Sequence, residues 1–268
     1  MNQIPIFLSG LPRSGSTLIS SLLNQHPDIH ASTTSHIFSL VDTVYNAFDS
    51  NMKTVYKKSD EQKRNATASL FKGSYSHINK TYIVDKNRVW PSRIKFIKEN
   101  FDFEPKIICC VRDVSEVLAS FITLCEKNKD DNFVDNILKE NNSVINNTNR
   151  CRFLWKYGVV GESWKSLFSG YNTNKKNLLI IEYNDILDNP KHIMKSIEKF
   201  IGAKHYKYDI NNLVPMKEHD EFHGMKGLHD IETKGIKRLS KPAYEIIGME
   251  NYNYYNNMQL HFWREGKI

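Results

Sequence analysis

The sequence has 268 residues, of which 40% are hydrophobic and 25% are charged, and its formal net charge is +7. This length permits one large hydrophobic core or two small ones. The composition excludes a collagen-like or a wholly disordered chain, and there is no run of about eighteen apolar residues that could span a bilayer. The apolar segment Ile4–Leu8 lacks the length and the basic flank of a signal peptide, so we expect a cytoplasmic protein.

Cysteines and charges narrow the possibilities further. The cysteines form no CxxC motif and no cluster with histidines at metal-ligand spacing, and we expect buried, reduced thiols at Cys109, Cys110, Cys125 and Cys151. Between Lys191 and Lys241, eleven Lys or Arg residues outnumber seven Asp or Glu residues. This excess indicates an anionic ligand or partner, or a solvated lysine-rich surface.

The first part of the chain alternates strands with helices. Ile4–Ser9 is a continuous apolar run, which is typical of a strand buried on both faces. A helix is predicted over Ser16–Asn24 because its leucines and isoleucine share one face, and it ends before a proline. Asp28–Ser32 is a weaker strand candidate, and Thr81–Asp85 is a second strand of the buried kind.

The alternation continues in the later part. Strands are predicted over Lys106–Val111 and Leu178–Glu182, and helices over Ser115–Leu124 and from Asn189 to Gly202, where Pro190 and the glycine mark the ends. Strands that alternate with helices predict an α/β layer fold with a parallel sheet.

Two stretches break this pattern. Lys127–Arg150 contains eight asparagines in 24 residues, so we expect a mobile loop or a weakly held helix there. Residues 205–240 mix His, Lys, Asp and Gly without periodicity and are interpreted as an irregular segment over a site. Neither resembles a linker, so we expect a single domain over 1–268 with a core at about 4–202. The aromatic-rich end, Tyr252–Trp263, suits core packing, a cover over a pocket or a homodimer contact.

The turn after the first strand has the spacing of a phosphate-binding loop. Gly10 and Gly15 enclose four residues, and Thr17 stands at the start of the following helix. Glycines let the backbone approach an anion, and the N–H groups of the first helical turn point at it. Ser16 occupies the position where a nucleoside triphosphatase has lysine, so Arg13 is the cation of the loop. A sulfuryl group carries less charge than a phosphoryl group and could be held by one guanidinium and the loop amides. A tight turn without a ligand is the alternative.

Two motifs carry a resemblance to a known family. Leu11–Leu18, followed by Leu22–Pro27, resembles the 5′-phosphosulfate loop of sulfotransferases that use 3′-phosphoadenosine 5′-phosphosulfate (PAPS), in particular the tyrosylprotein branch and its bacterial relatives. Ile107–Asp113 together with Ser120 resembles the second signature of this family, in which a strand is followed by Arg-Asp and by a Ser eight residues after the Arg. Over most of 4–202 this resemblance implies a three-layer P-loop NTPase-like fold, with a central parallel sheet flanked by helices. It also implies PAPS as co-substrate, 3′,5′-adenosine bisphosphate (PAP) as product, and no metal.

The resemblance also implies roles for individual residues. The 5′-phosphosulfate would contact Pro12, Arg13, Ser14, Gly15, Ser16 and Thr17. Arg112 and Ser120 would hold the 3′-phosphate, whereas the alternative is a surface pair of Arg112 with Asp113. Lys86 would stabilise the charge that develops on the sulfuryl group and its leaving phosphate. Tyr183 would lie near the adenine or be an aromatic at the edge of the core. The basic residues Lys234, Lys237 and Arg238 could close over the 3′-phosphate or simply be solvated.

The general base is where this sequence departs from the resemblance. Relatives in the tyrosylprotein branch have a Glu just after the second strand, and that position here is Thr34. Threonine cannot act as a base at neutral pH. His36 is the nearest titratable residue and our first candidate, because histidine titrates near neutral pH. The alternative bases are His219, His223 and His229, and any of these histidines could instead be structural.

We therefore expect a PAPS-dependent sulfotransferase in which Lys86, His36 and Arg13 act in catalysis. A Mg²⁺-dependent kinase or nucleotidase with Asp85 as metal ligand is the second hypothesis, and Ser16 argues against it. A non-catalytic nucleotide-binding protein is the third, favoured by Thr34. Nucleic-acid binding is not indicated, because the sequence has no basic helix interleaved with aromatic residues. The acceptor, whether a small molecule, a peptide or a glycan, does not follow from the sequence.

Overall fold

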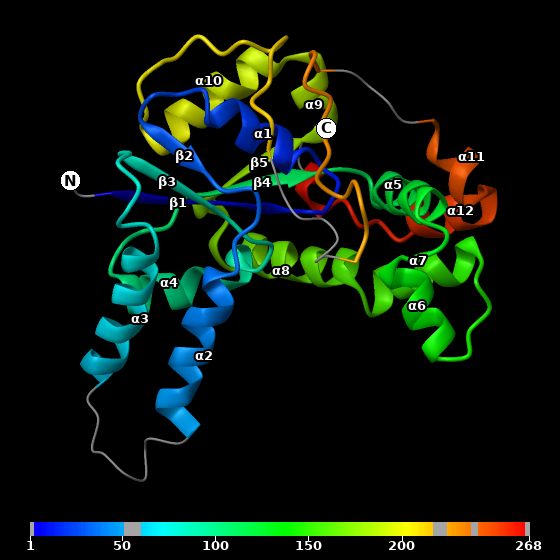
Figure 1. Ribbon diagram of the computed structural model, residues 1–268, viewed down its shortest axis with the longest axis horizontal. Helices are drawn as coiled ribbons and strands as arrows, with labels where there is room; N and C mark the ends of the chain where they lie inside the picture. Colours follow the sequence, from blue (N-terminus) through cyan, green and yellow to red (C-terminus); the bar gives the residue numbers. More distant parts are fainter. Residues whose placement is uncertain (1–2, 51–59, 217–223, 237–240, 266–268) are drawn as a thin grey trace.

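A parallel β-sheet forms the centre of the molecule in the computed structural model, which describes residues 3–50, 60–216, 224–236 and 241–265. Its strands lie in the order β2-β3-β1-β4-β5, and every neighbouring pair is parallel (Figure 1). Their bounds are β1 Ile4–Gly10, β2 Ile29–Ala31, β3 Tyr82–Lys86, β4 Ile107–Val111 and β5 Leu178–Glu182. The predicted strands are confirmed, including the weaker candidate at β2.

Helices cover both faces of this sheet. Along β1, Ile6 and Leu8 pack into the core on one face, and Phe7 packs into the core on the other, because successive side chains of a strand point to opposite faces. The first face is covered by α1 (Ser16–Leu23), α9 (Tyr183–Asp188) and α10 (Pro190–Ile201). The second is covered by α3 (Asp60–Ser74), α4 (Ile94–Phe101), α5 (Val114–Lys127) and α8 (Val159–Asn174). These layers confirm the predicted α/β fold class.

The remaining elements surround these layers. Helix α2 (Ile37–Ser50) packs along α3, and the two project together from the body of the molecule (Figure 1). At the other end lie α6 (Phe133–Glu140), α7 (Asn147–Lys156), α11 (Ala243–Ile247) and α12 (Met249–Asn257). Short 3-10 turns complete the described residues: η1 (Trp90–Arg93), η2 (Lys175–Asn177) and η4 (Phe262–Arg264).

The asparagine-rich stretch 127–150, predicted as a mobile loop or a weakly held helix, contains α6 and the start of α7. Asn132 and Asn146 cap these helices, each accepting a hydrogen bond from a backbone N–H. Between the helices, the buried Arg150 donates from Nε and NH2 to both oxygens of Asp135 at 2.7 Å. The mobile-loop alternative is therefore wrong for residues 133–140 and 147–150, where the helix alternative is confirmed. Asparagines cap both helices, and Asn132 and Asn147 also form hydrogen bonds with Asp135 and Arg150.

The aromatic-rich C-terminal segment packs into the core. Phe262 contacts three aromatic rings of α8, with ring centroids 5.6, 5.1 and 4.9 Å away at Trp164, Phe168 and Tyr171. Trp263 is also buried. Of the three roles predicted for this segment, the structure therefore shows core packing, while the homodimer contact stays a prediction.

The cysteines and the helices can be compared with the predictions of buried thiols and of no membrane-spanning segment. All four cysteines are free and buried, and burial raises the pKa of Cys110, Cys125 and Cys151 to about 12. The prediction of buried thiols is confirmed, and these groups are poor nucleophiles at neutral pH. Within the described ranges, no helix combines the length and apolar character needed to cross a membrane.

Gly10 is needed where the end of β1 meets the end of β4. Its φ of 109° lies in a region that disfavours side chains, and a β-carbon built on it would lie 2.0 Å from the carbonyl oxygen of Cys110. The same carbonyl accepts a hydrogen bond from the N–H of Leu11 at 2.8 Å. The first strand can therefore enter its loop only without a side chain at this position.

We expect Gly10→Ala to lower the free energy of unfolding by more than about 3 kcal/mol, because the contact is with backbone and the backbone conformation is unfavourable. Urea unfolding followed by circular dichroism measures this change. Gly73→Ala is the matched control, since nothing lies within 4 Å of its added β-carbon, and it should be neutral or slightly stabilising. A Gly10→Ala protein within about 1 kcal/mol of wild type would contradict this account.

Candidate functional site

The loop that joins β1 to α1 presents the N-terminus of the helix to a cavity. Arg13 has a φ of 58° and Gly15 a φ of 88°, so the chain turns sharply twice before α1 begins. Gly15 is the N-cap and offers no side chain to the first N–H groups of the helix. These groups therefore favour an anion at this end of α1.

A cavity of about 1220 Å³ lies beside this loop and brings together most of the residues predicted for the nucleotide site. It is lined by Arg13, Gly15, Ser16, Thr17, Lys86, Arg112, Ser120 and Tyr183, among others. Pro12 and Ser14 do not line it: both are buried, and the Ser14 hydroxyl donates to the Pro12 carbonyl at 3.3 Å. The side chain of Ser14 thus shapes the loop from within.

The two motifs that were distant in the sequence contact each other here. The Nε of Arg13 donates to the Ser120 hydroxyl at 3.1 Å, and its NH1 donates to the carbonyl of Leu228. Arg112 donates from NH1 to the carbonyl of Arg13 at 3.4 Å. Two guanidinium groups and a hydroxyl therefore line one part of the cavity, which suits an anionic group with several oxygens.

Arg112 is held by its neighbours rather than by Asp113. It is 7% exposed, its Nε lies 2.8 Å from the carboxylate of Glu116, and its guanidinium stacks 4.4 Å from the ring centre of Tyr183. Asp113 instead contacts Arg264 at 2.6 Å. The surface pair of Arg112 with Asp113 that the sequence allowed is therefore not formed.

Lys86 and Asp85 are adjacent in β3 and point to opposite faces of the sheet. Lys86 is 7% exposed, lines the cavity and donates to the Thr17 hydroxyl at 3.1 Å. Asp85 is fully buried, accepts hydrogen bonds from Tyr75 and from Trp90, the latter at 2.7 Å, and lines neither cavity. Asp85 is thus a core residue and does not face the loop as a metal ligand would.

A smaller cavity of about 200 Å³ adjoins the large one. Lys86, Arg88 and His229 line both cavities, whereas Thr34 and His36 line the smaller one alone. His36 is exposed, while His229 is 7% exposed and its Nε2 lies 3.4 Å from the Thr34 hydroxyl. The two cavities therefore meet at Lys86, with two histidines nearby.

The irregular segment expected over a site does cover one where it is described. Residues 224–236 supply Leu228 and His229 to both cavities. His219, His223, Lys237 and Arg238 lie outside the described residues. Lys234 is described and lines neither cavity.

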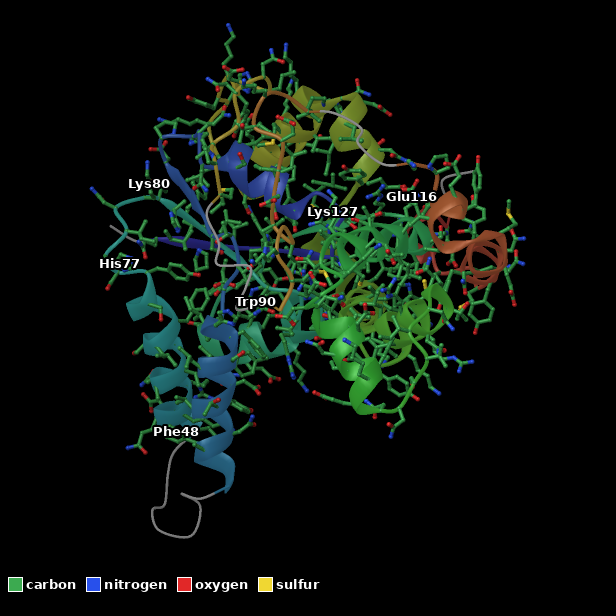
Figure 2. The ribbon with its side chains drawn as sticks, turned by 45° about the vertical axis from the view of Figure 1, so that its right-hand side comes forward. Phe48, His77, Lys80, Trp90, Glu116 and Lys127 are labelled. Atoms are coloured by element: carbon green, nitrogen blue, oxygen red, sulfur yellow. The ribbon has the colours of Figure 1, made fainter. Side chains whose placement is uncertain are left out.

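The sequence analysis missed several residues of the site. Glu116, which is labelled in Figure 2, lines the large cavity, and its carboxylate lies 2.8 Å from the Nε of Arg112. It stands four residues after Arg112, near the start of a predicted helix, and this spacing could have indicated the pair. Arg88 also lines the large cavity, and its position two residues after Lys86 could have suggested this. Leu228 could not be found, because it contributes a backbone carbonyl from an irregular segment.

Metal-ligand geometry is not evident in this region. Across the ranges that the structure describes, no three His, Cys, Asp or Glu side chains gather in a way that could hold a metal ion. The charged groups of the large cavity are mainly cations, including Arg13, Lys86, Arg88 and Arg112. This arrangement suits a polyanionic ligand.

Comparison with known proteins gives a consistent result. A model of the "Sulfotransferase family" matches residues 5–207, and no curated protein sequence matches the chain. The fold is similar to the sulfotransferase domain of the Synechococcus PCC 7002 olefin synthase, with a TM-score of 0.54 and 16% identity over 94% of this chain and 96% of that one. It is also similar to the sulfotransferase domain from the curacin biosynthetic pathway, with a TM-score of 0.53 and 14% identity over 94% and 99%. These two likenesses support the predicted P-loop NTPase-like fold.

The buried state of Asp85 has a consequence for stability that can be measured. Burial raises the pKa of this carboxyl above its ordinary value of 3.8, so the folded protein keeps the proton to a higher pH than the unfolded chain does. Stability falls with rising pH wherever the folded state binds more protons. Asn at this position is always neutral and both donates and accepts, as the protonated acid does.

The free energy of unfolding of wild type minus that of Asp85→Asn should therefore decrease as the pH rises above 3.8. Urea titrations of both proteins across a pH series give this difference. A difference that is constant with pH would show that the pKa of Asp85 is not shifted, and one that grows with pH would show a stabilised carboxylate. Either result would contradict this account.

Proposed function

The chain belongs to the sulfotransferase family, and from this membership we propose that it transfers the sulfuryl group of PAPS to an acceptor hydroxyl without a metal ion. The observation that supports the donor most is the convergence of Arg13, Lys86 and Arg112 with the N-terminus of α1 on one cavity. Its volume of about 1220 Å³ is ample for a nucleotide, since ligand pockets commonly measure about 300–1,000 Å³.

Each phosphate of the nucleotide has a matching set of donors in this proposal. The N–H groups at residues 15–17 and the hydroxyls of Ser16 and Thr17 hold the 5′-phosphosulfate. The guanidinium of Arg112 and the hydroxyl of Ser120 hold the 3′-phosphate, and Arg13, which contacts Ser120, joins the two sets. Tyr183, already stacked on Arg112, would lie against the adenine.

Lys86 lines both cavities, so its ammonium can act on the sulfuryl group during the transfer. The acceptor oxygen forms a bond to sulfur while the bond between sulfur and the 5′-phosphate oxygen breaks, and the proton of the acceptor passes to a base. Lys86 stabilises the charge that grows on the departing oxygen. Its contact with Thr17 holds the ammonium beside the loop that binds this group.

We propose that a histidine of the smaller cavity accepts the proton. His36 is the first candidate from the sequence, and His229 lines the same cavity from another segment. Contact with Thr34 and burial favour a fixed orientation for His229, whereas His36 is exposed. Histidine is the side chain that most often serves as a general base.

The acceptor and the setting are further proposals. The smaller cavity measures about 200 Å³, which suits the reacting end of a small molecule, a peptide or a glycan. The free, buried cysteines support a cytoplasmic location. The burial of Asp85 leaves the kinase hypothesis without the metal ligand it requires.

Isothermal titration with PAP in the presence of EDTA tests the donor site. We expect binding that EDTA does not weaken, and a loss of at least about tenfold in Arg112→Ala, since hydrogen bonds to charged groups contribute about 1.5–3 kcal/mol. Lys165→Ala, which removes an exposed pair with Glu162, is the control and should bind as wild type does. No binding in EDTA, or tighter binding of ATP with Mg²⁺, would contradict the proposal.

Comparison of His36→Gln with His229→Gln identifies the base. The variant that lacks the base should lose at least about a hundredfold in the single-turnover rate of sulfuryl transfer from labelled PAPS, because general base catalysis contributes about 10²–10⁴-fold. Its affinity for PAP should be unchanged, and the other variant is its matched control. Full activity in both variants would exclude both histidines, and a wild type that forms no labelled product from a broad acceptor mixture would favour a non-catalytic binding protein.

A further inference from the structure

Arg264 joins the ends of two neighbouring strands at the site. Its Nε lies 3.1 and 3.0 Å from the two oxygens of Glu182, the last residue of β5, and its NH2 lies 2.5 Å from one of them. The same NH2 lies 2.6 Å from Asp113, which follows the end of β4 and is the N-cap residue of α5. One guanidinium thus bridges carboxylates from two adjacent parallel strands.

Each of these carboxylates stands next to a residue of the proposed nucleotide site. Asp113 follows Arg112 directly, and Glu182 directly precedes Tyr183. Arg112 and Tyr183 stack on each other at 4.4 Å. A contact that joins Asp113 to Glu182 therefore acts on the two backbone positions beside Arg112 and Tyr183.

The turn that carries Arg264 is itself firmly anchored. Phe262 and Trp263 are buried, and the Nε2 of His261 lies 3.5 Å from Asp113. Arg264 is 38% exposed and lines neither cavity, so it is not placed to touch a ligand. Its hydrogen bonds to Glu182 and its proximity to Asp113 raise its pKa further, which keeps the bridge charged.

We propose that Arg264 is a positioning residue for the nucleotide site: by holding Asp113 and Glu182 together, it orients Arg112 and Tyr183. This inference rests on the proposed function. It also extends the site beyond residues 5–207, the part that matches the family, to the segment around η4.

The affinities of PAP and of adenosine 5′-monophosphate, measured for each protein by isothermal titration, test the proposal. Arg264→Ala should weaken the binding of PAP by about tenfold, or about 1.4 kcal/mol. It should weaken the binding of the monophosphate much less, because only PAP carries the 3′-phosphate that Arg112 is proposed to hold. Arg264→Lys keeps the charge but lacks the two-pronged geometry, so its preference for PAP should be intermediate. Arg152→Ala, at an exposed arginine that lines neither cavity, should keep the wild-type preference.

The pattern of losses distinguishes the possible outcomes. A purely structural role for Arg264 predicts lower thermal stability with the PAP preference unchanged, or an equal loss for both nucleotides, and either result overturns the inference. If Arg264→Ala does not fold, the same criterion applies to Arg264→Lys. A wild-type protein that binds neither nucleotide would overturn the proposed function itself.

Discussion

The backbone contact between Gly10 and Cys110 is the constraint on which the rest of the site depends. A β-carbon at Gly10 would lie 2.0 Å from the Cys110 carbonyl, so β1 and β4 can meet at this edge of the sheet only because residue 10 is glycine. Two residues beyond Cys110 stands Arg112, and three beyond Gly10 stands Arg13. This close contact brings the two arginines to one cavity.

Several positively charged side chains of the site are largely buried. Arg112 and Lys86 are each 7% exposed, and burying a charge is costly unless it finds hydrogen-bonding partners. Glu116 and Thr17 supply part of that compensation. The interaction of an anionic ligand with these cations would be stronger in a cavity than in open solvent.

The central sheet could be predicted from the sequence, because strands buried on both faces are continuous apolar runs, and the predicted strands match β1, β3, β4 and β5 closely. The loop could be predicted as well, since its spacing of glycines has few structural interpretations. Adjacent strand residues point to opposite faces, but which of Asp85 and Lys86 faces the cavity was not predictable, because the phase of a short buried strand depends on its neighbours.

Other parts of the site depend on contacts between distant segments. Leu228 and His229 reach the cavities from a stretch without periodicity, and Arg264 contacts Glu182 across 82 residues. The asparagines of 127–150 left a loop and a helix both open, because composition alone does not distinguish a helix cap from a loop. The sequence motifs therefore located the loop proposed to bind the donor and the strand end beside it, but not the residues that enclose or support them.

The bridge made by Arg264 also bears on the order in which the protein folds. Asp113 and Glu182 carry like charges at the ends of adjacent parallel strands, and they are synthesised well before Arg264, which follows Glu182 by 82 residues. Until that arginine docks, the two carboxylates repel each other, and long-range strand pairing is already slow because distant segments must meet first. We therefore expect β5 to close onto β4 at this edge late in folding, after the strands that do not depend on Arg264 have paired.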